Sequence, residues 1–556
     1  MNRTFFYCCL ALGLAWRVWM LTHYALVSGG EVDVYLADEG IVGLMGKHIL
    51  EGRELPVFFY GQSYLGALEA YCAAISFALF GTGFLSLRLV PFLFSVGLGV
   101  VVYRFAHRFY SVAVARWATA LVAVSPMYFL QWNLKARGGF VEHVFLVFVV
   151  MMLFWTFYLY HRREAGTALA LGFVSGVALW VNQLVGAYLA VMAGLLWLRR
   201  EDRRGWKPAL VGLLIGSSLL IAYNLVHPLA TVRSLARKAL VMNRVDVQQR
   251  GDNWAGKGLA ARVEALGDGF DKLGIVFGVP PGEGVQRLGM SEEAREGGPL
   301  GPIRRWLFFL PLLVFAVALV AARPRRGPGG WSGVGSDQLL GLFALVTFVV
   351  GYVSPRYMLP AYPLAAVLAA VLVSRLEGAR HRWMTGGLVA VLVFHVAGWV
   401  DAAVLPSASN GAGAADVAAV GATDEARGEL LVQWLDDRGI RACYSASPLY
   451  HLVFAGGERV VISPLQKNRY PAYDRLVEET ESICYVFRDD QSDKRQHVAM
   501  LALLASKGVR YQASDVGPYR VLHDFAPRRA ILAADVEAVR HAPDPAGGPD
   551  DSPETE

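Results

Sequence analysis

The chain has 556 residues, of which 55% are hydrophobic and only 18% are charged. Its many long apolar runs exclude a soluble globular protein and indicate a membrane protein that crosses the bilayer several times. The net charge of +6 does not indicate a nucleic-acid partner, because the Lys and Arg residues lie in short loops between the apolar runs.

One crossing takes about 20 apolar residues, and this length predicts about eleven membrane spans. The predicted spans are 5–28, 84–105, 112–130, 143–160, 166–182, 184–198, 208–227, 304–322, 338–353, 358–375 and 383–404. Arg17 interrupts the first span and no small-residue cleavage site follows it, so we expect this span to stay attached. Together the spans predict a membrane domain over residues 1–404.

Basic residues gather in alternate loops. One side of the membrane receives Arg3, Arg104, Arg108, Arg162, Arg163, and the basic loops 199–207, 323–326 and 375–382. The opposite side receives the acids at 33–39 and Glu142. The positive-inside rule therefore places the N-terminus in the cytoplasm and the C-terminus outside.

The first outer loop, residues 29–83, carries the adjacent acids Asp38 and Glu39 at the edge of the membrane. Charge beside hydrocarbon is costly and usually serves a function. We therefore predict that the two carboxylates activate an acceptor or hold a metal ion. The alternative is ordinary helix capping, in which Asp38 begins a helix and Glu39 lies in its first turn. The apolar stretch 65–80 of this loop is not counted as a span, because a span there would invert every later loop.

Four basic residues lie at outer membrane edges and are candidates for binding a lipid phosphate: Arg88, Lys135, Arg137 and Arg356. A guanidinium suits phosphate because its fork of donors matches the phosphate oxygens. The alternative for Arg88 and Arg356 is that they extend to the lipid headgroups as membrane anchors.

A divalent cation is a further possibility in the outer loops. Glu142 and His143 could join Asp38 around a metal ion, since carboxylates suit magnesium or manganese and imidazole suits softer metals such as zinc. Adjacent residues of a helix point about 100° apart. A single ligand, or none, from Glu142 and His143 is therefore favoured over a pair.

After residue 404 the composition becomes that of a soluble domain, predicted over residues 405–540. Strands are predicted at 442–445, 460–462, 483–487, 509–513 and 519–523, with helices near 423–437, 449–454, 473–479 and 497–506. This alternation predicts a small α/β domain with a mainly parallel sheet. Cys443 and Cys484 could form a disulfide if this domain faces an oxidising compartment. Residues 541–556 are expected to be a disordered tail.

Several motifs, in this order, resemble those of the GT-C glycosyltransferases: Asp38-Glu39, then Tyr60-Gly61-Gln62-Ser63-Tyr64-Leu65-Gly66-Ala67-Leu68-Glu69-Ala70-Tyr71, then Arg88-Leu89-Val90-Pro91, then Arg356-Tyr357-Met358-Leu359-Pro360. The nearest branch is that of protein O-mannosyltransferases and lipid A aminoarabinose transferases. Members of that branch often carry a His-Pro-Pro type sequence in the first loop. This chain has Tyr60-Gly61-Gln62 there, and the departure leaves both the acceptor and the metal site open.

The resemblance covers most of residues 1–404 and implies a polytopic, mainly helical GT-C fold. The fold class expected for the whole chain is this membrane domain with a small extracytoplasmic C-terminal α/β domain, and the expected location is a bacterial inner membrane. It implies an inverting, metal-dependent or metal-assisted transfer of a sugar from a polyprenyl-phosphate donor to a protein, lipid or glycan acceptor. If the roles of the family's residues are transferred to the matching positions of this sequence, Asp38 and Glu39 are the catalytic acids, and Arg88 and Arg356 hold the donor phosphate.

Two other classes of function remain open from the sequence. A transporter or flippase of lipid-linked glycans would be expected to carry ionisable residues within the membrane and an internal repeat. A non-catalytic scaffold for envelope assembly would use the α/β domain as its binding module. Replacing Asp38 by Asn separates both from an enzyme.

Overall fold

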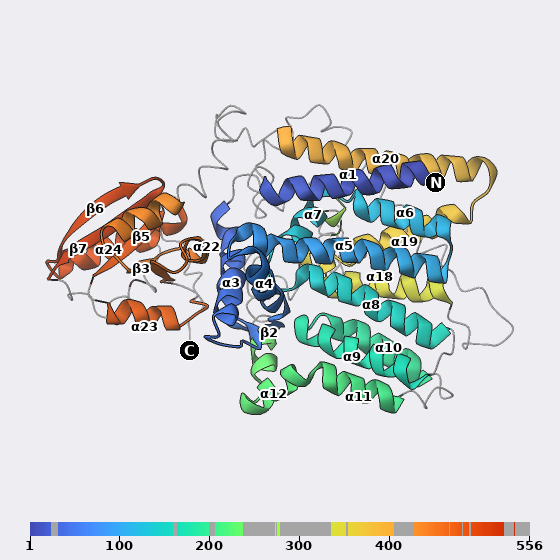
Figure 1. Cartoon of the computed structure of the whole chain (residues 1–556), viewed down its shortest axis with the longest axis horizontal. Helices are drawn as coiled ribbons and strands as arrows, with labels where there is room; N and C mark the ends of the chain where they lie inside the picture. The colour runs from blue at the N-terminus through green and yellow to red at the C-terminus, as the bar shows by residue number, and fades with distance from the viewer. Residues whose placement is uncertain are drawn as a thin grey trace, which may run out of the picture.

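The computed structural model describes residues 1–23, 32–159, 164–198, 206–236, 273, 275–277, 335–351, 354–404, 428–465, 468–480, 482–488, 491–527 and 539. Its long apolar helices lie side by side in one bundle (Figure 1). These helices are α1 (Arg3–Thr22), α5 (Phe84–Phe109), α6 (Val112–Ala123), α8 (Phe140–Leu159), α9 (Ala165–Val181), α10 (Val185–Leu198), α11 (Trp206–Gly216), α18 (Ser336–Gly351), α19 (Ala361–Ser374) and α20 (Gly378–Val404).

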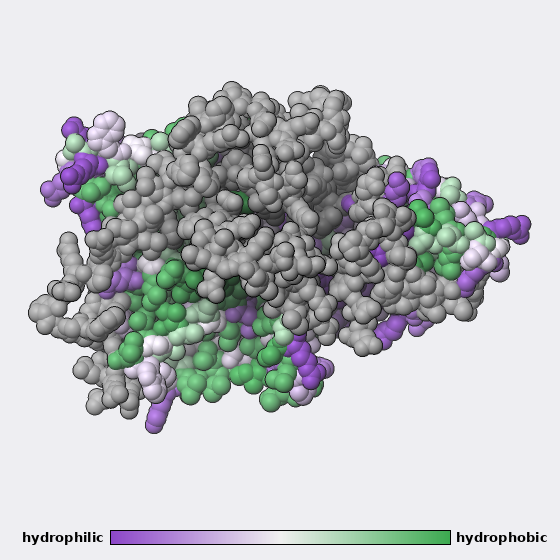
Figure 2. Space-filling view, turned by 180° about the vertical axis from the view of Figure 1, so that it is seen from behind, coloured by the Kyte–Doolittle hydropathy of each residue, from purple (hydrophilic) through white to green (hydrophobic). Residues whose placement is uncertain are grey.

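The outer surface of the bundle is apolar. Where residues of the bundle are coloured in Figure 2, they are largely hydrophobic, and hydrophilic residues lie mostly toward its ends and on the C-terminal domain. Large apolar side chains such as Leu14, Leu93 and Leu214 are exposed on three different helices. Such a surface is costly in water and suits lipid contact, as expected for a helix that crosses a membrane.

Fewer helices meet the length of a full span than the eleven predicted. Among the described residues, five helices are long and apolar enough to cross a membrane, or up to seven if each of two bent helix pairs is one span. The predicted spans 166–182, 184–198 and 338–353 correspond to α9, α10 and α18, which have 17, 14 and 16 residues. The predicted span 304–322 lies outside the described residues.

One bent pair explains the buried Arg17. Helix α6 and the short helix α7 (Met127–Leu134) meet at 78°, which leaves the last carbonyls of α6 without partners in a helix. The Arg17 guanidinium donates to the carbonyls of Val122 and Ala123, at 2.9 and 2.5 Å. A buried arginine in the membrane domain therefore caps a helix break, and nothing in this contact requires a transport pathway.

Two helices lie across one end of the bundle (Figure 1). They are α3 (Val32–Leu50) and α4 (Leu68–Phe80), joined through the short strands β1 (Phe58–Phe59) and β2 (Gln62–Gly66). Helix α4 has 13 residues and is about 20 Å long, too short for the roughly 30 Å of hydrocarbon in a bilayer. The segment that was not counted as a span is thus a short helix at the bundle end, and it begins after a strand that the sequence did not predict.

The C-terminal domain lies beyond α3 and α4, at the end of the bundle opposite the N-terminus (Figure 1). Its strands are β3 (Ala442–Ser445), β4 (Val461–Pro464), β5 (Ile483–Arg488), β6 (Arg510–Val516) and β7 (Tyr519–Ala526), in the order β4-β3-β5-β7-β6. Its labelled helices are α22 (Tyr450–Ala455), α23 (Ala472–Glu479) and α24 (Gln491–Ser506), and residues 428–437 are also helical.

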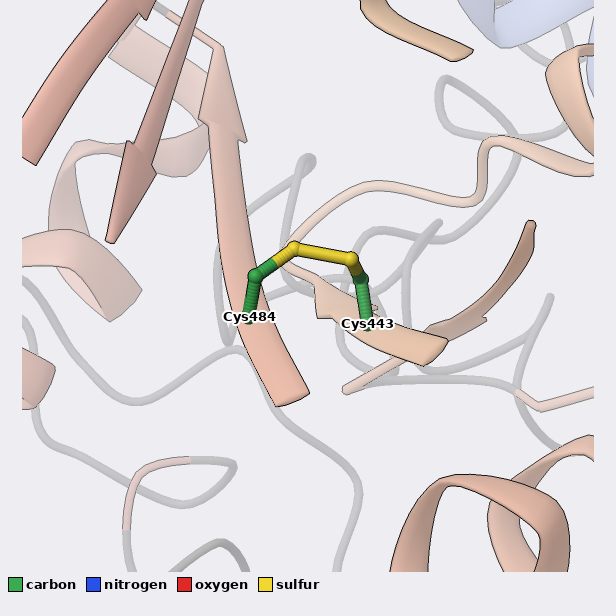
Figure 3. Close-up of a disulfide and its surroundings, with 2 residues drawn as sticks. All are labelled: Cys443 and Cys484. Atoms are coloured by element: carbon green, nitrogen blue, oxygen red, sulfur yellow. A yellow bond between two sulfur atoms is a disulfide. The ribbon is translucent and has the colours of Figure 1, made fainter. Parts of the chain in front are cut away.

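The sheet is mixed, where the alternation of strands and helices predicted a mainly parallel one. Strand β3 pairs in parallel with β4 and β5, whereas β7 pairs antiparallel with β5 and β6. The difference arises because only a two-residue turn, 517–518, joins β6 to β7, and so short a connection returns the chain antiparallel. Cys443 and Cys484 lie opposite each other on β3 and β5 and form a disulfide (Figure 3).

Candidate active site

The acid pair lies within helix α3 rather than at its start. The helix begins at Val32, so capping by Asp38 is not the role of this residue. Adjacent side chains on a helix point about 100° apart. Accordingly Glu39 is fully buried at 0% exposure, whereas Asp38 is only partly buried. The two neighbouring acids therefore have different surroundings.

Glu39 forms an ion pair with Arg88 of α5. The Arg88 guanidinium donates from Nε to Oε1 at 3.2 Å and from Nη2 to Oε2 at 3.1 Å, which is a two-pronged contact between buried groups. Arg88 thus points into the protein and does not extend to lipid headgroups. A buried ion pair of this geometry fixes the helix that carries the acids against α5.

Three cations surround the Glu39 carboxylate. Burial by itself would raise the pKa of this carboxyl group, but the charges of Arg88, Lys135 and Arg137 lower its pKa below the usual range. Glu39 is therefore ionised at neutral pH and acts as a fixed negative charge. It is poorly suited to exchange protons during a reaction, because its charge is needed by its neighbours.

Lys135 and Arg137 lie on the loop between α7 and α8. Lys135 is 2% exposed, and the Arg137 guanidinium lies over the Trp132 ring at 4.3 Å from its centroid. Burial, together with the charge of Arg137, lowers the pKa of Lys135 well below its usual value, while Glu39 and Asp38 act against this. An anionic group placed here would relieve the repulsion between the two cations.

Arg356 approaches the same place from the far end of the sequence. It lies in the short 3-10 helix η5 (Pro355–Met358), immediately before α19. Its guanidinium interacts electrostatically with Asp38 and lies near the rings of Tyr357 and Phe140. The structure therefore brings together six predicted site residues: Asp38, Glu39, Arg88, Lys135, Arg137 and Arg356.

Glu142 and His143 do not join this group as metal ligands. Both are buried in the first turn of α8, and none of their side-chain nitrogen or oxygen atoms has a hydrogen-bond partner. Glu142 interacts with Glu69. Among the residues that the structure describes, no three or more His, Cys, Asp or Glu side chains are arranged to hold a metal ion. The described side chains thus do not fit the predicted metal site of Asp38, Glu142 and His143.

The sequence reasoning missed Glu69 as a site residue. This acid lies in the first turn of α4, is 1% exposed, and interacts electrostatically with Glu39. Its carboxylate contacts the loop that carries Lys135 and Arg137. The signal was present in the sequence, because Glu69 is a single charge inside the apolar stretch 65–80, and such charges usually have a function.

The C-terminal domain also contacts α3. Glu458 is held by His48 at 2.9 Å, by Tyr473 at 2.8 Å and by Arg53 at 3.0 Å, and it also binds Lys47. Burial would raise the pKa of Glu458, but the hydrogen bonds from His48 and Lys47 lower it to about 2. This charged contact fixes the end of α3 to the domain, and no sequence motif indicates it.

Comparison with known proteins identifies the fold. Residues 67–227 match the family profile of dolichyl-phosphate-mannose-protein mannosyltransferase. The crystal structure of ArnT from Cupriavidus metallidurans bound to undecaprenyl phosphate matches with a TM-score of 0.54 at 13% identity, over 91% of this chain and 97% of ArnT. The chain has the GT-C glycosyltransferase fold. The predicted resemblance is thereby confirmed.

Two further solved structures are similar to different degrees. The apo structure of the same ArnT also has a TM-score of 0.54, at 14% identity, over 92% of this chain and 98% of ArnT. An oligosaccharyltransferase from Archaeoglobus fulgidus has a TM-score of 0.45 at 14% identity, over 92% of this chain and 73% of its own. No curated protein sequence matches the chain. In this GT-C fold, the matched family region holds Arg88, Lys135 and Arg137 but neither the acid pair nor Arg356.

Proposed function

We propose that the protein transfers a sugar from a polyprenyl-phosphate donor to a protein, lipid or glycan acceptor at the end of the bundle that carries α3. The observation that supports this most is the meeting of a partly exposed Asp38 with several cations at one place. A prenyl-linked donor keeps its tail in the bilayer, so its phosphate must be bound at the membrane edge. The GT-C fold, and the undecaprenyl phosphate bound in the similar ArnT structure, support the same class of donor.

In this proposal Asp38 is the general base. It takes the proton of the acceptor hydroxyl while the acceptor oxygen bonds to the anomeric carbon of the sugar. The bond from that carbon to the phosphate oxygen breaks, and its electron pair stays on the leaving phosphate. Lys135, Arg137 and Arg356 stabilise the charge that builds on this phosphate. The reaction inverts the anomeric carbon, because attack and departure occur on opposite faces.

The ion pair has a supporting role in this mechanism. Glu39 holds the guanidinium of Arg88 with both carboxylate oxygens, and this contact orients α3 and therefore Asp38. Arg88 keeps a role near the donor phosphate only as part of this pair. The sequence predicted two catalytic acids, whereas in this proposal Asp38 is the base and Glu39 is a positioning residue.

We infer the membrane orientation from the two ends of the bundle. The N-terminus lies at one end, and the C-terminal domain lies at the other with α3 (Figure 1). A disulfide such as Cys443–Cys484 persists in an oxidising compartment. Together with the basic loops of the sequence, this supports a cytoplasmic N-terminus and an extracytoplasmic C-terminal domain. A bacterial inner membrane is part of the proposal. Eleven spans remain our proposal for the whole chain.

The test compares Asp38→Asn with Asp337→Asn in a deletion strain that carries each variant. Asp337 is a matched control, because it is a partly buried acid on α18 that pairs with Arg375 far from the acid pair. Mass spectrometry of envelope glycans and glycoproteins is the readout, with immunoblots of membrane fractions to equalise the amount of protein. We expect Asp38→Asn to lose transfer and Asp337→Asn to retain it.

Wild-type transfer by a correctly inserted Asp38→Asn protein would overturn the proposed mechanism and favour a scaffold. A transporter would give a different result. In that case the unmodified lipid-linked glycan would accumulate on the cytoplasmic leaflet of the deletion strain, and purified protein in vesicles would transfer no sugar to any acceptor.

A further inference from the structure

Glu69 makes an unusual contact with the loop behind the acid pair. Its Oε2 atom accepts hydrogen bonds from the backbone N–H groups of Gly138 and Gly139, at 2.6 and 3.0 Å. These two residues immediately precede α8. The carboxylate thus binds orphan donors at the start of a helix, but it does so from another helix, across the site.

The turn that Glu69 contacts has a backbone conformation that favours glycine at both positions. Gly138 and Gly139 have backbone φ angles of +83° and +89°, which residues other than glycine rarely adopt. The turn lies one residue after Arg137 and three residues after Lys135. Its conformation therefore decides where these two cations point, and both of them act on Glu39.

The contact is costly for the fold, which argues for a role in function. Glu69 is almost fully buried, its Oε1 atom has no hydrogen-bond partner, and the nearby Glu142 carboxylate is also buried without partners. Burial and the charge of Glu142 raise the pKa of Glu69 well above its usual value. Oε2 can accept both amide hydrogens in either protonation state, so the contact does not depend on the charge.

We propose that Glu69 is a positioning residue that fixes the Gly138–Gly139 turn and so directs Lys135 and Arg137 toward the phosphate of the donor. The functional part of this inference depends on the proposed function, in which these cations bind that phosphate. The contact itself does not depend on it. An experiment can therefore measure the turn and the phosphate site separately.

The experiment uses the full-length protein in lipid nanodiscs. Hydrogen exchange of the segment 135–140 reports the turn, and titration with undecaprenyl phosphate reports the phosphate site. The variants are Glu69→Ala, Glu69→Gln and Glu69→Asp. Ser76→Ala is the matched control on the same helix, because Ser76 is buried and donates to the Ser86 carbonyl at 2.6 Å. Lys135→Ala tests the phosphate site directly.

We expect Glu69→Ala to speed the exchange of 135–140 and to weaken undecaprenyl phosphate binding by about 10- to 100-fold, as for loss of the two hydrogen bonds that hold the turn. Glu69→Gln should restore both, since its amide oxygen replaces Oε2. Glu69→Asp keeps the carboxyl group but is one methylene shorter, so we expect it to fail as well. It also provides a second variant if the alanine protein does not fold.

The outcomes separate the two claims. If Lys135→Ala weakens binding while Glu69→Ala and Glu69→Asp leave exchange and binding unchanged, the positioning role is overturned. If Glu69→Ala speeds exchange but neither it nor Lys135→Ala affects binding, the proposed phosphate site is overturned and only the turn contact stands. Weaker binding in Ser76→Ala equal to that in Glu69→Ala would reduce the effect to general damage of α4 and so overturn the inference.

Discussion

Gly40 of α3 and His451 of α22 are in backbone contact across two domains. A Cβ atom at Gly40 would lie 2.3 Å from the backbone nitrogen of His451, closer than real Cβ atoms ever come. A Cβ atom at Gly43, about one turn later, would lie 2.7 Å from the Phe454 ring. Since Gly40 follows Glu39 directly, the C-terminal domain packs on the very turn that carries the acid pair.

Gly40→Ala should therefore separate the C-terminal domain from α3. Overpacking usually costs about 1–3 kcal/mol, and the upper end applies here because the opposing atoms are backbone and cannot rotate away. The measurement is thermal unfolding of the purified protein, combined with the transfer assay. Gly398→Ala in α20 is the control, because open space surrounds that position and the change should not lower the melting temperature. Equal melting temperatures for both variants would contradict the close approach.

Breaking the Glu39–Arg88 pair should be costly for the fold. Removing one partner of a buried ion pair costs about 3–5 kcal/mol, because the other charge stays buried without compensation. We expect Glu39→Gln and Arg88→Met each to lower the unfolding free energy strongly, and the double variant to lose much less than the sum. A double-mutant cycle of unfolding free energies measures this. Strictly additive losses would mean that the two side chains do not interact.

The Glu458 contact should make domain stability fall at low pH. Its folded pKa of about 2 lies below the ordinary value of 4.5, so the ionised form is favoured by folding. The stabilisation is therefore fully present above pH 4.5 and is lost as the pH falls toward 2. We expect the melting temperature of Glu458→Gln to depend less on pH in this window than that of the wild type. Parallel pH profiles would rule out this contribution.

The disulfide should stabilise the C-terminal domain. Cys443 and Cys484 are 41 residues apart, and closing a loop of that length contributes up to about 4 kcal/mol by restricting the unfolded chain. Cys443→Ser should lower the melting temperature, and the wild type should lose the same amount in reductant. Cys8→Ser is the control, because Cys8 is exposed and carries no disulfide.

Thiol labelling of whole cells also tests orientation: labelling of Cys443 before reduction would argue against an oxidising compartment.

Much of the architecture could be predicted from the sequence, because its cause is local. Lipid cannot hydrogen-bond the backbone, so apolar stretches must become helices. Ten of the eleven predicted spans overlap described helices or bent helix pairs, of which five to seven are long enough to cross a membrane. The strands at 442–445 and 483–487 were predicted to within one residue of β3 and β5. Helix lengths and the antiparallel β7 were not predictable, since they depend on breaks and pairings with distant segments.

The candidate site could be predicted only as a set of residues. Charges beside apolar runs indicated Asp38, Glu39 and Arg88, and also the cations Lys135 and Arg137. The structure brings these residues together. The same rule applied to Glu69 would have added it. No local pattern could indicate the contact of His48 with Glu458, which are 410 residues apart in the sequence. Such contacts depend on how two finished surfaces meet.

The sequence by itself determined that this chain is a helical membrane protein, and it indicated the acid pair and the cations as candidate site residues, because hydropathy and charge act residue by residue. The tertiary structure alone decided which acid is available. The rotation between neighbours on α3 buries Glu39 against Arg88 and leaves Asp38 partly exposed, and that rotation is fixed only when α5 and the C-terminal domain pack on the helix.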